Sequence, residues 1–212
     1  MISNDEFSVE KITSQIIKIG KYMGDKGYTP GYSGNISARI DDKILITTSG
    51  VSNAHLKDSD LTLMNFEGES LCPEKKPSSE KNLHIQFYKM RSDINYILHV
   101  HSPFLSAFAS ANRDLLSPIM AENVYYFKGI PLAEYALPST DALVENTAKY
   151  FLDYDAVLMA NHGFIIGSAS LKDAYLKLEL AEHYAQVVIN TEILGGAKVL
   201  SSAQANEILN LR

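Results

Sequence analysis

Three kinds of feature are scarce in this sequence, and each scarcity excludes a class of protein. Cys72 is the only cysteine, so no disulfide can form within the chain and a reducing compartment is expected. No apolar run is long enough to span a bilayer. Residues 1–6 carry neither the basic nor the apolar region of a secretory signal. We therefore expect a cytoplasmic protein with no membrane partner.

Positive charge is also scarce. The net charge is −6, and the pair Lys75 and Lys76 is too small to neutralise a phosphate backbone. The composition predicts no nucleic-acid partner. With 46% hydrophobic and 21% charged residues, the 212-residue chain has the composition of an ordinary globular protein, so we expect a single domain over residues 1–212.

Helical and strand patterns are interspersed along the chain. Stretches with apolar residues at helical spacing predict helices over 9–23, 77–91, 104–111, 141–152, 170–194 and 203–211. Short apolar runs bounded by turn residues predict strands over 36–40, 43–48, 61–65, 94–101, 156–160 and 164–166. Residues 115–137 show no clear pattern. Interspersed helices and strands favour one α/β domain.

A His-x-His pair closes one of these strands. His99 and His101 are two residues apart, so on a strand their side chains point the same way. Alone, such a pair is more often a polar strand surface, and His162 beside a glycine is more often a turn residue. If Glu80 joins the three imidazoles, however, the donor set suits a borderline metal such as Zn²⁺ in a catalytic site.

The remaining histidines are weaker candidates. The chain has six in all: His55, His84, His99, His101, His162 and His183. His84 lies four residues after Glu80 on the same helical face and could be a ligand, but we favour a structural role for it. His183 falls within a long helix as a surface or packing residue, and His55 lies in a loop without a nameable partner.

Three short segments have the chemistry of an anion site. They are Gly34 with Asn35 in a tight turn, Ser49 with Gly50 after a strand, and Ser78 with Ser79 at a helix start. Glycine lets backbone amides approach a ligand, and a helix start offers free amides and a positive dipole end. Each segment alone is more often a plain turn or cap. Together, beside a candidate metal site, they suggest a small phosphorylated substrate.

Five segments in this order carry a family resemblance. They are Gly34-Asn35-Ile36-Ser37-Ala38-Arg39, Ile46-Thr47-Thr48-Ser49-Gly50, Pro77-Ser78-Ser79-Glu80, His99-Val100-His101 and Asn161-His162-Gly163. Over roughly residues 12–191 the chain resembles the class II aldolase/adducin family. The resemblance implies a three-layer α/β/α sandwich around a largely antiparallel central sheet. It also implies a homotetramer with active sites at subunit interfaces.

The resemblance also implies roles for individual residues. One divalent metal per subunit, Zn²⁺ first and Mn²⁺ second, would be bound by His99, His101 and His162. Glu80 would be the acid–base carboxylate and could also bind the metal. The residues matching the family's phosphate positions are Gly34, Asn35, Ser49, Gly50, Ser78 and Ser79.

One position departs from the family pattern. A sugar-phosphate member of the family brings in a tyrosine from a neighbouring subunit where an ungapped count from His101 reaches Met120. Glu122, Tyr125 and Tyr126 lie just beyond it, and we take them as candidate catalytic residues for the aldehyde half of the substrate.

The activity implied by the resemblance is that of a lyase. It is a metal-dependent aldolase that cleaves a (deoxy)ketose 1-phosphate, such as fuculose or 5-deoxyribulose 1-phosphate, into dihydroxyacetone phosphate and a small aldehyde. Methylthioribulose-1-phosphate dehydratase and pentulose-phosphate 4-epimerase remain alternatives on the same fold. A non-catalytic adducin-like module predicts missing ligands, whereas this sequence contains all of them.

Overall fold

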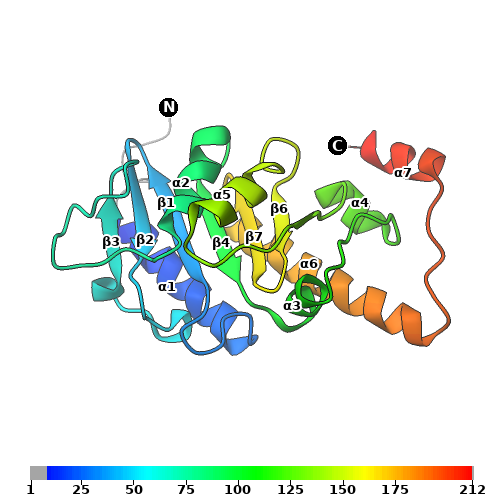
Figure 1. Ribbon diagram of the computed structural model, residues 1–212, viewed down its shortest axis with the longest axis horizontal. Helices are drawn as coiled ribbons and strands as arrows, with labels where there is room; N and C mark the ends of the chain where they lie inside the picture. Colours follow the sequence, from blue (N-terminus) through cyan, green and yellow to red (C-terminus); the bar gives the residue numbers. More distant parts are fainter. Residues whose placement is uncertain (1–8, 212) are drawn as a thin grey trace.

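A seven-stranded sheet forms the centre of the molecule (Figure 1). The computed structural model describes residues 9–211. The strands are β1 (Asn35–Ile40), β2 (Lys43–Thr47), β3 (Leu61–Met64), β4 (Tyr96–Val100), β5 (Leu132–Ala133), β6 (Ala156–Met159) and β7 (Gly163–Ser168). Their order in the sheet is β3-β2-β1-β4-β7-β6-β5, and only the β5–β6 pair is parallel. The largely antiparallel sheet expected from the sequence is confirmed.

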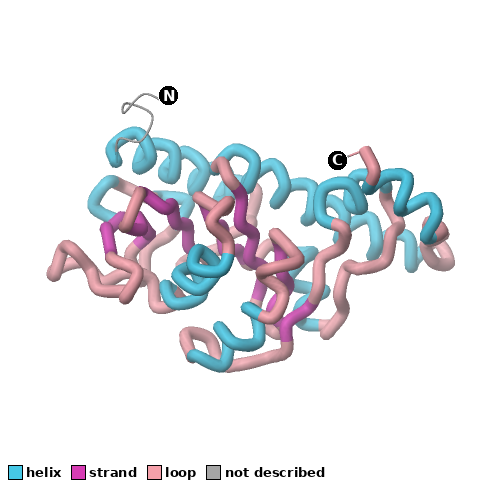
Figure 2. Tube along the Cα trace, turned by 90° about the horizontal axis from the view of Figure 1, so that it is seen from above, coloured by secondary structure: helices cyan, strands magenta, loops and turns pink. Residues whose placement is uncertain are grey.

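Helices cover both faces of this sheet (Figure 2). They are α1 (Val9–Asp25), α2 (Lys81–Met90), α3 (Pro103–Ser110), α4 (Ala121–Phe127), α5 (Asp141–Ala148), α6 (Leu171–Ile193) and α7 (Ser202–Leu209), with short 3₁₀ turns η2 (Asn53–His55) and η3 (Asp58–Asp60). One layer contains α1, α3 and α6, and the other contains α2 and α5. Within residues 9–211, no helix has the length and apolar character needed to cross a membrane.

Strand alternation divides the core into two halves. In β4, Leu98 packs with the α1, α3 and α6 layer, whereas the preceding Ile97 packs with the α2 and α5 layer. Both side chains are fully buried because successive residues on a strand face opposite sides of the sheet. The strands that carry the histidines are therefore held rigidly between two apolar layers.

Two local expectations differ from the structure, and one stretch without an expectation contains two elements. Helix α2 begins at Lys81 with Glu80 as its N-cap residue, so the Ser78–Ser79 pair lies in the turn before the helix. Helix α5 ends at Ala148 rather than at residue 152, because the chain turns there and the Phe151 ring stacks on Phe87, with ring centroids 3.9 Å apart. Residues 115–137, which had no clear pattern, contain α4 and β5.

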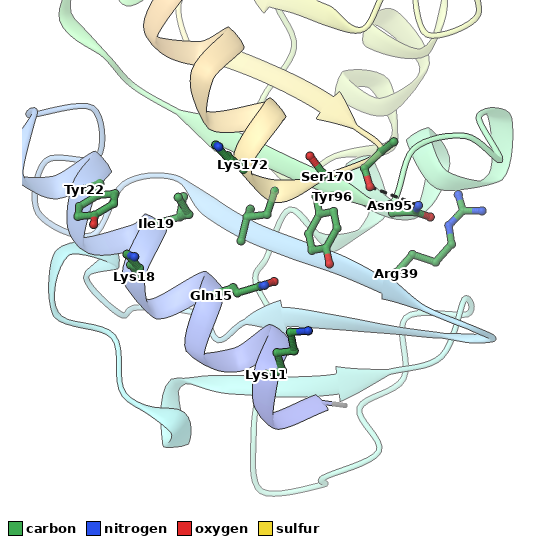
Figure 3. A pocket seen from close by; sticks show the side chains of 12 residues that line it. Lys11, Gln15, Lys18, Ile19, Tyr22, Arg39, Asn95, Tyr96, Ser170 and Lys172 are labelled. Carbon is green, nitrogen blue, oxygen red and sulfur yellow. Dashed lines mark hydrogen bonds between the residues drawn. The ribbon is translucent and has the colours of Figure 1, made fainter. Parts of the chain in front are cut away.

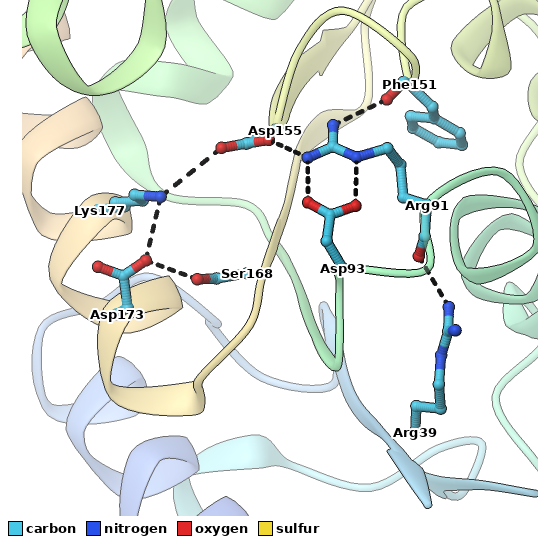
Figure 4. A network of polar contacts seen from close by, with 8 residues as sticks. All are labelled: Arg39, Arg91, Asp93, Phe151, Asp155, Ser168, Asp173 and Lys177. Atoms are coloured by element: carbon cyan, nitrogen blue, oxygen red, sulfur yellow. Dashed lines mark hydrogen bonds and ion pairs between the residues drawn. The ribbon is translucent and has the colours of Figure 1, made fainter. Parts of the chain in front are cut away.

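A cluster of ion pairs lies at the end of the sheet where β4 and β6 begin (Figure 4). The Arg91 guanidinium donates to both carboxylate oxygens of Asp93, at 2.7 and 2.8 Å, and to Asp155 at 2.7 Å. Lys177 lies 3.6 Å from Asp155 and 3.0 Å from Asp173. We call these five residues the Arg91 cluster. Its cations and carboxylates are paired with one another.

Candidate active site

Three histidines meet at the opposite end of the same strands. His99 lies in β4, His101 follows that strand directly, and His162 lies in the turn between β6 and β7. Their ring centroids are 4.8 to 5.1 Å apart, and each ring offers a nitrogen within 4.8 Å of the others. The three imidazoles predicted as metal ligands are thus brought together by non-local pairing of β4 with β7.

The orientation of His99 is fixed by the backbone. Its ring is fully buried, and its Nδ1 lies 2.9 Å from the carbonyl oxygen of Phe164. Because a carbonyl can only accept, Nδ1 carries the proton and Nε2 faces the other rings. The Nε2 atom of His101 lies 3.0 Å from this Nε2. The hydrogen bond from Nδ1 of His99 to the Phe164 carbonyl is typical of metal-binding histidines, in which one ring nitrogen binds the metal and the other donates to an oxygen.

Two glycines make room for the cluster. A Cβ atom at Gly163 would lie 2.7 Å from Cδ2 of His101, so a larger residue would displace that ring. A Cβ atom at Gly34 would lie 2.5 Å from the carbonyl oxygen of His99, and Gly34 also has a positive φ of 73°. Both positions therefore require glycine for the chain to pass close to the histidines.

Glu80 faces the same point from the start of α2. Its Oε2 lies 3.1 Å from Nε2 of His99, and its Oε1 lies 3.1 Å from Nε2 of His162. Burial acts to raise the pKa of the Glu80 carboxyl, but the charges and hydrogen bonds of His99 and His162 outweigh burial and hold it below its usual range. Glu80 is therefore an ionised carboxylate next to three imidazoles.

This donor set fits a divalent cation. Burial first, and then the charges of His99 and His162, lower the pKa of His101 to about 3, so this ring is neutral and its lone pair is available. A carboxylate and imidazole nitrogens that converge in a buried site call for positive charge between them. Nitrogen and carboxylate donors suit Zn²⁺ or Mn²⁺. His99, His101 and His162 would hold the ion, with Glu80 beside it.

A cavity of about 300 Å³ opens beside the cluster. All six predicted phosphate residues line it, together with Glu80, His101 and His162. The residues that complete its lining are Tyr32, Ser33, Thr48, Val51, Pro138 and Ser139, none of which the sequence patterns assigned a role.

The backbone around the cavity limits which donors a phosphate can use. The amide of Ser49 donates to the carbonyl of Lys76, and the amide of Ser78 donates to the carbonyl of Thr47. The donors on these two segments that donate no hydrogen bond in the described chain include the hydroxyls of Ser49, Ser78 and Ser79 and the amides of Ser79 and Gly50. Several short donors around one small anion are the arrangement that phosphate binding requires.

The candidates on α4 do not reach this cavity within one chain. Glu122 is exposed, Tyr126 is 41% exposed, and Met120 packs against the core. Among the described residues that line the cavity, none comes from α4. The rings of Tyr125 and Tyr126 contact each other with centroids 4.9 Å apart. Any role in the reaction would require α4 of another copy of the chain.

Glu182 supports the site, although no sequence pattern assigned it a role. This carboxylate on α6 is 5% exposed and accepts hydrogen bonds from the Ser102 hydroxyl at 2.7 Å and from the amides of Phe104 and Leu105 at 2.8 and 2.9 Å. It thereby caps the start of α3, directly after His101. The available signal was an acidic residue on the apolar stripe of a long helix.

A second cavity, of about 590 Å³, lies between α1, the edge of β4 and the start of α6 (Figure 3). Its lining residues are Lys11, Gln15, Lys18, Ile19, Tyr22, Arg39, Asn95, Tyr96, Ala169, Ser170, Leu171 and Lys172. This described lining contains neither a histidine nor a carboxylate. The smaller cavity therefore holds the acid–base and metal-binding chemistry.

Comparison with known proteins places the chain in a family. Residues 14–189 match the family described as Class II Aldolase and Adducin N-terminal domain, and the chain belongs to this family. The L-fuculose phosphate aldolase of Methanocaldococcus jannaschii is 35% identical over 175 residues, which cover 82% of this chain and 94% of that protein. The 5-deoxy-D-ribulose 1-phosphate aldolase of Bacillus thuringiensis is 33% identical over 195 residues, covering 91% of each.

A solved structure agrees with this assignment. An L-fuculose 1-phosphate aldolase superposes with a TM-score of 0.89 at 29% sequence identity, covering 96% of this chain and 97% of that one. Class II aldolases use a divalent metal, which agrees with the three-histidine cluster. The resemblance inferred from five short segments is confirmed at the level of the family and the fold.

Proposed function

We propose that this chain is a metal-dependent class II aldolase, a lyase that splits the C3–C4 bond of a deoxyketose 1-phosphate. The products are dihydroxyacetone phosphate and a small aldehyde. The observation that carries the proposal is the meeting of Glu80 with three histidines at one wall of a cavity that all six predicted phosphate residues line. Relatives named for fuculose phosphate and 5-deoxyribulose 1-phosphate make these two sugars the first candidates.

The chain's own residues account for binding and for one proton transfer. Ser49, Gly50 and Ser79 hold the phosphate and so place the sugar's first three carbons against Glu80. A divalent cation held by the histidines supplies Lewis-acid stabilisation of the negative charge that develops on the substrate. When the C3–C4 bond breaks, its electron pair stays on C3. Glu80, which is ionised in the resting site, takes up a proton from solvent and delivers it to C3; in the reverse direction the carboxylate removes that proton from C3.

The proton of the C4 hydroxyl needs a second group. We assign it to Glu122, Tyr125 or Tyr126 from the α4 helix of a neighbouring copy, in a homotetramer with shared active sites. The exposure of this part of α4 supports the assignment. Mixed assemblies test it. Glu80→Gln chains combined with chains that carry Glu122→Gln, Tyr125→Phe and Tyr126→Phe should regain activity, whereas each assembly alone should not.

The decisive assay measures dihydroxyacetone phosphate release over a panel of ketose 1-phosphates, with and without a chelator. Chelator-sensitive release from a deoxyketose 1-phosphate is the expected result, with one Zn²⁺ or Mn²⁺ per subunit. Loss of water without dihydroxyacetone phosphate would instead indicate a dehydratase, and inversion at C4 an epimerase. A protein without turnover or bound metal would be a binding module.

A further inference from the structure

A row of buried hydrogen-bonded side chains runs from the interior to Glu80. The hydroxyl of Tyr88 lies 2.8 Å from Oγ of Ser37, which lies 2.7 Å from Nδ1 of His84. Nε2 of His84 bonds to Oδ1 of Asn35, and Nδ2 of Asn35 donates to Oε2 of Glu80 at 3.1 Å. None of the five residues is more than 9% exposed. We call them the buried row.

The chemistry of its members gives the row one direction. Because the Asn35 amide nitrogen donates to a carboxylate, its oxygen must accept, and Nε2 of His84 must carry a proton. This holds whether the His84 ring is neutral or charged. In the neutral ring, Nδ1 accepts from the Ser37 hydroxyl, whereas the Tyr88 hydroxyl lies within reach of both Ser37 and the carbonyl of Asn95, at 2.8 and 3.4 Å. From Ser37 onward, every donor in the buried row points towards Glu80.

The direction matters because a rotation of the Asn35 side-chain amide by 180° exchanges the positions of its oxygen and nitrogen. Turned by half a rotation, Asn35 would set its carbonyl oxygen against the Glu80 carboxylate and its amide protons against the Nε2 proton of His84. The first contact would bring two acceptors together, and the second would bring two donors together. Both contacts are buried, where unsatisfied polar groups are costly and neighbouring hydrogen bonds strengthen one another. Glu80 and His84 therefore exclude this orientation together, one from each side of the Asn35 amide.

We propose that His84 is a positioning residue that acts through Asn35 to hold Glu80 in place for proton transfer at C3. The inference rests on the proposed aldolase function. His84 is fully buried and lies outside the cavity lining, so it touches no substrate atom. Asn35 lines the cavity and contacts Glu80 at once. The second amide proton of Asn35 remains available to the substrate. The hydrogen bond from Asn35 to Glu80 therefore orders both the carboxylate and this part of the cavity wall.

Three variants separate positioning from packing. His84→Phe keeps the ring volume and removes the donor, so kcat should fall about tenfold to a hundredfold, the size seen when supporting hydrogen bonds of metal sites are lost. His84→Gln keeps an amide donor near Nε2 and should restore most of the rate. In an Asn35→Ala background, His84→Phe should cause no further loss, because the group through which it acts is gone.

The contrary results are equally definite. An unchanged kcat in His84→Phe, equal losses in His84→Phe and His84→Gln, or full additivity with Asn35→Ala would each overturn the proposal. Circular dichroism and metal analysis of every variant check that the fold and the bound ion persist.

A measurement on the wild-type protein covers the case in which His84→Phe does not fold. The ¹⁵N chemical shifts of the His84 ring should show the proton on Nε2 and a lone pair on Nδ1. A ring protonated only at Nδ1 would reverse the row and overturn the proposal. Absence of aldolase turnover in the wild-type protein, with the Nε2–H form present, would instead reject the proposed function and leave the row's direction established.

Discussion

The two ends of the β4, β6 and β7 strands carry charged clusters of opposite character. At the end where β4 and β6 begin, Arg91 is bonded to Asp93 and Asp155, and these hydrogen bonds raise the pKa of its guanidinium despite burial. At the other end, His99 and the neighbouring imidazoles surround the single carboxylate of Glu80. The histidine cluster is more deeply buried than the Arg91 cluster, and its charges are less completely paired.

This difference separates a structural cluster from a functional one. In the Arg91 cluster each cation already faces a carboxylate, so nothing further is required for stability. In the histidine cluster a single carboxylate meets three imidazoles with no lysine or arginine beside it, so its charge is balanced only by a protonated histidine or by a bound ion. Perturbed ionisation alone does not identify an active site, because both clusters show it. Incomplete charge pairing next to a cavity is the better criterion.

The largest expected effect comes from removing an imidazole. His162→Ala should reduce both bound metal and turnover, the latter by about a thousandfold or more, because Lewis-acid stabilisation is worth several kcal/mol. Metal analysis and the dihydroxyacetone phosphate assay measure the two effects. His183→Ala is the matched control, since His183 is exposed on α6 and should keep both properties. Wild-type metal content in His162→Ala would remove this histidine from the ligand set.

Glu80→Gln should abolish most of the turnover while the metal remains bound. The amide keeps the size of the side chain but cannot deliver a proton, so turnover should fall about 10²- to 10⁴-fold, the usual range for general acid–base groups. Metal content should stay close to that of the wild type, because three histidines remain. Glu192→Gln, an exposed change on α6, serves as the control. Full activity in Glu80→Gln would eliminate its acid–base role.

Local sequence patterns predicted the elements but not the contacts between them. The β1–β2 hairpin and the long helix α6 were predicted within a few residues, because their apolar spacing is regular. By contrast, β5 has only two residues and exists through its parallel pairing with β6, which no local pattern encodes.

The site shows the same division between local and non-local information. The histidine pair was visible because its two members are only two residues apart in the chain. The bond from Asn35 to Glu80 spans 45 residues, and the contacts of Glu182 span about 80, so only the folded chain brings these groups together. The roles of Glu122, Tyr125 and Tyr126 on the aldehyde half of the substrate stay a prediction, because α4 contributes no residue to the cavity within one chain.

At the other end of the strands, Arg91→Ala should affect stability and leave catalysis intact. The substitution removes a largely buried guanidinium that ties Asp93, Asp155 and the carbonyl of Phe151 together. The free energy of unfolding should drop by about 2 kcal/mol, measured by urea denaturation. Lys21→Ala is the control, because its pair with Asp25 is well exposed and should contribute less than about 0.5 kcal/mol. A large loss of kcat in Arg91→Ala would contradict the division of roles.

The smallest expected effect is a pH dependence confined to the Arg91 cluster. Hydrogen bonds from Arg91 hold the pKa of Asp93 below its usual range, although burial opposes this. A carboxyl with a lowered pKa in the folded state stabilises the protein above its unfolded pKa of about 3.9, and this contribution is lost as the pH falls through the folded value. Wild-type protein should therefore be more stable than Asp93→Asn by less than about 1 kcal/mol at pH 6, because Asp93 is mostly exposed. The difference should shrink below pH 4. Taking the difference between the two proteins at each pH cancels any loss of metal from the histidines. A difference that stays constant down to pH 2.5 would mean that the charge of Asp93 adds nothing to the stability of this end of the sheet.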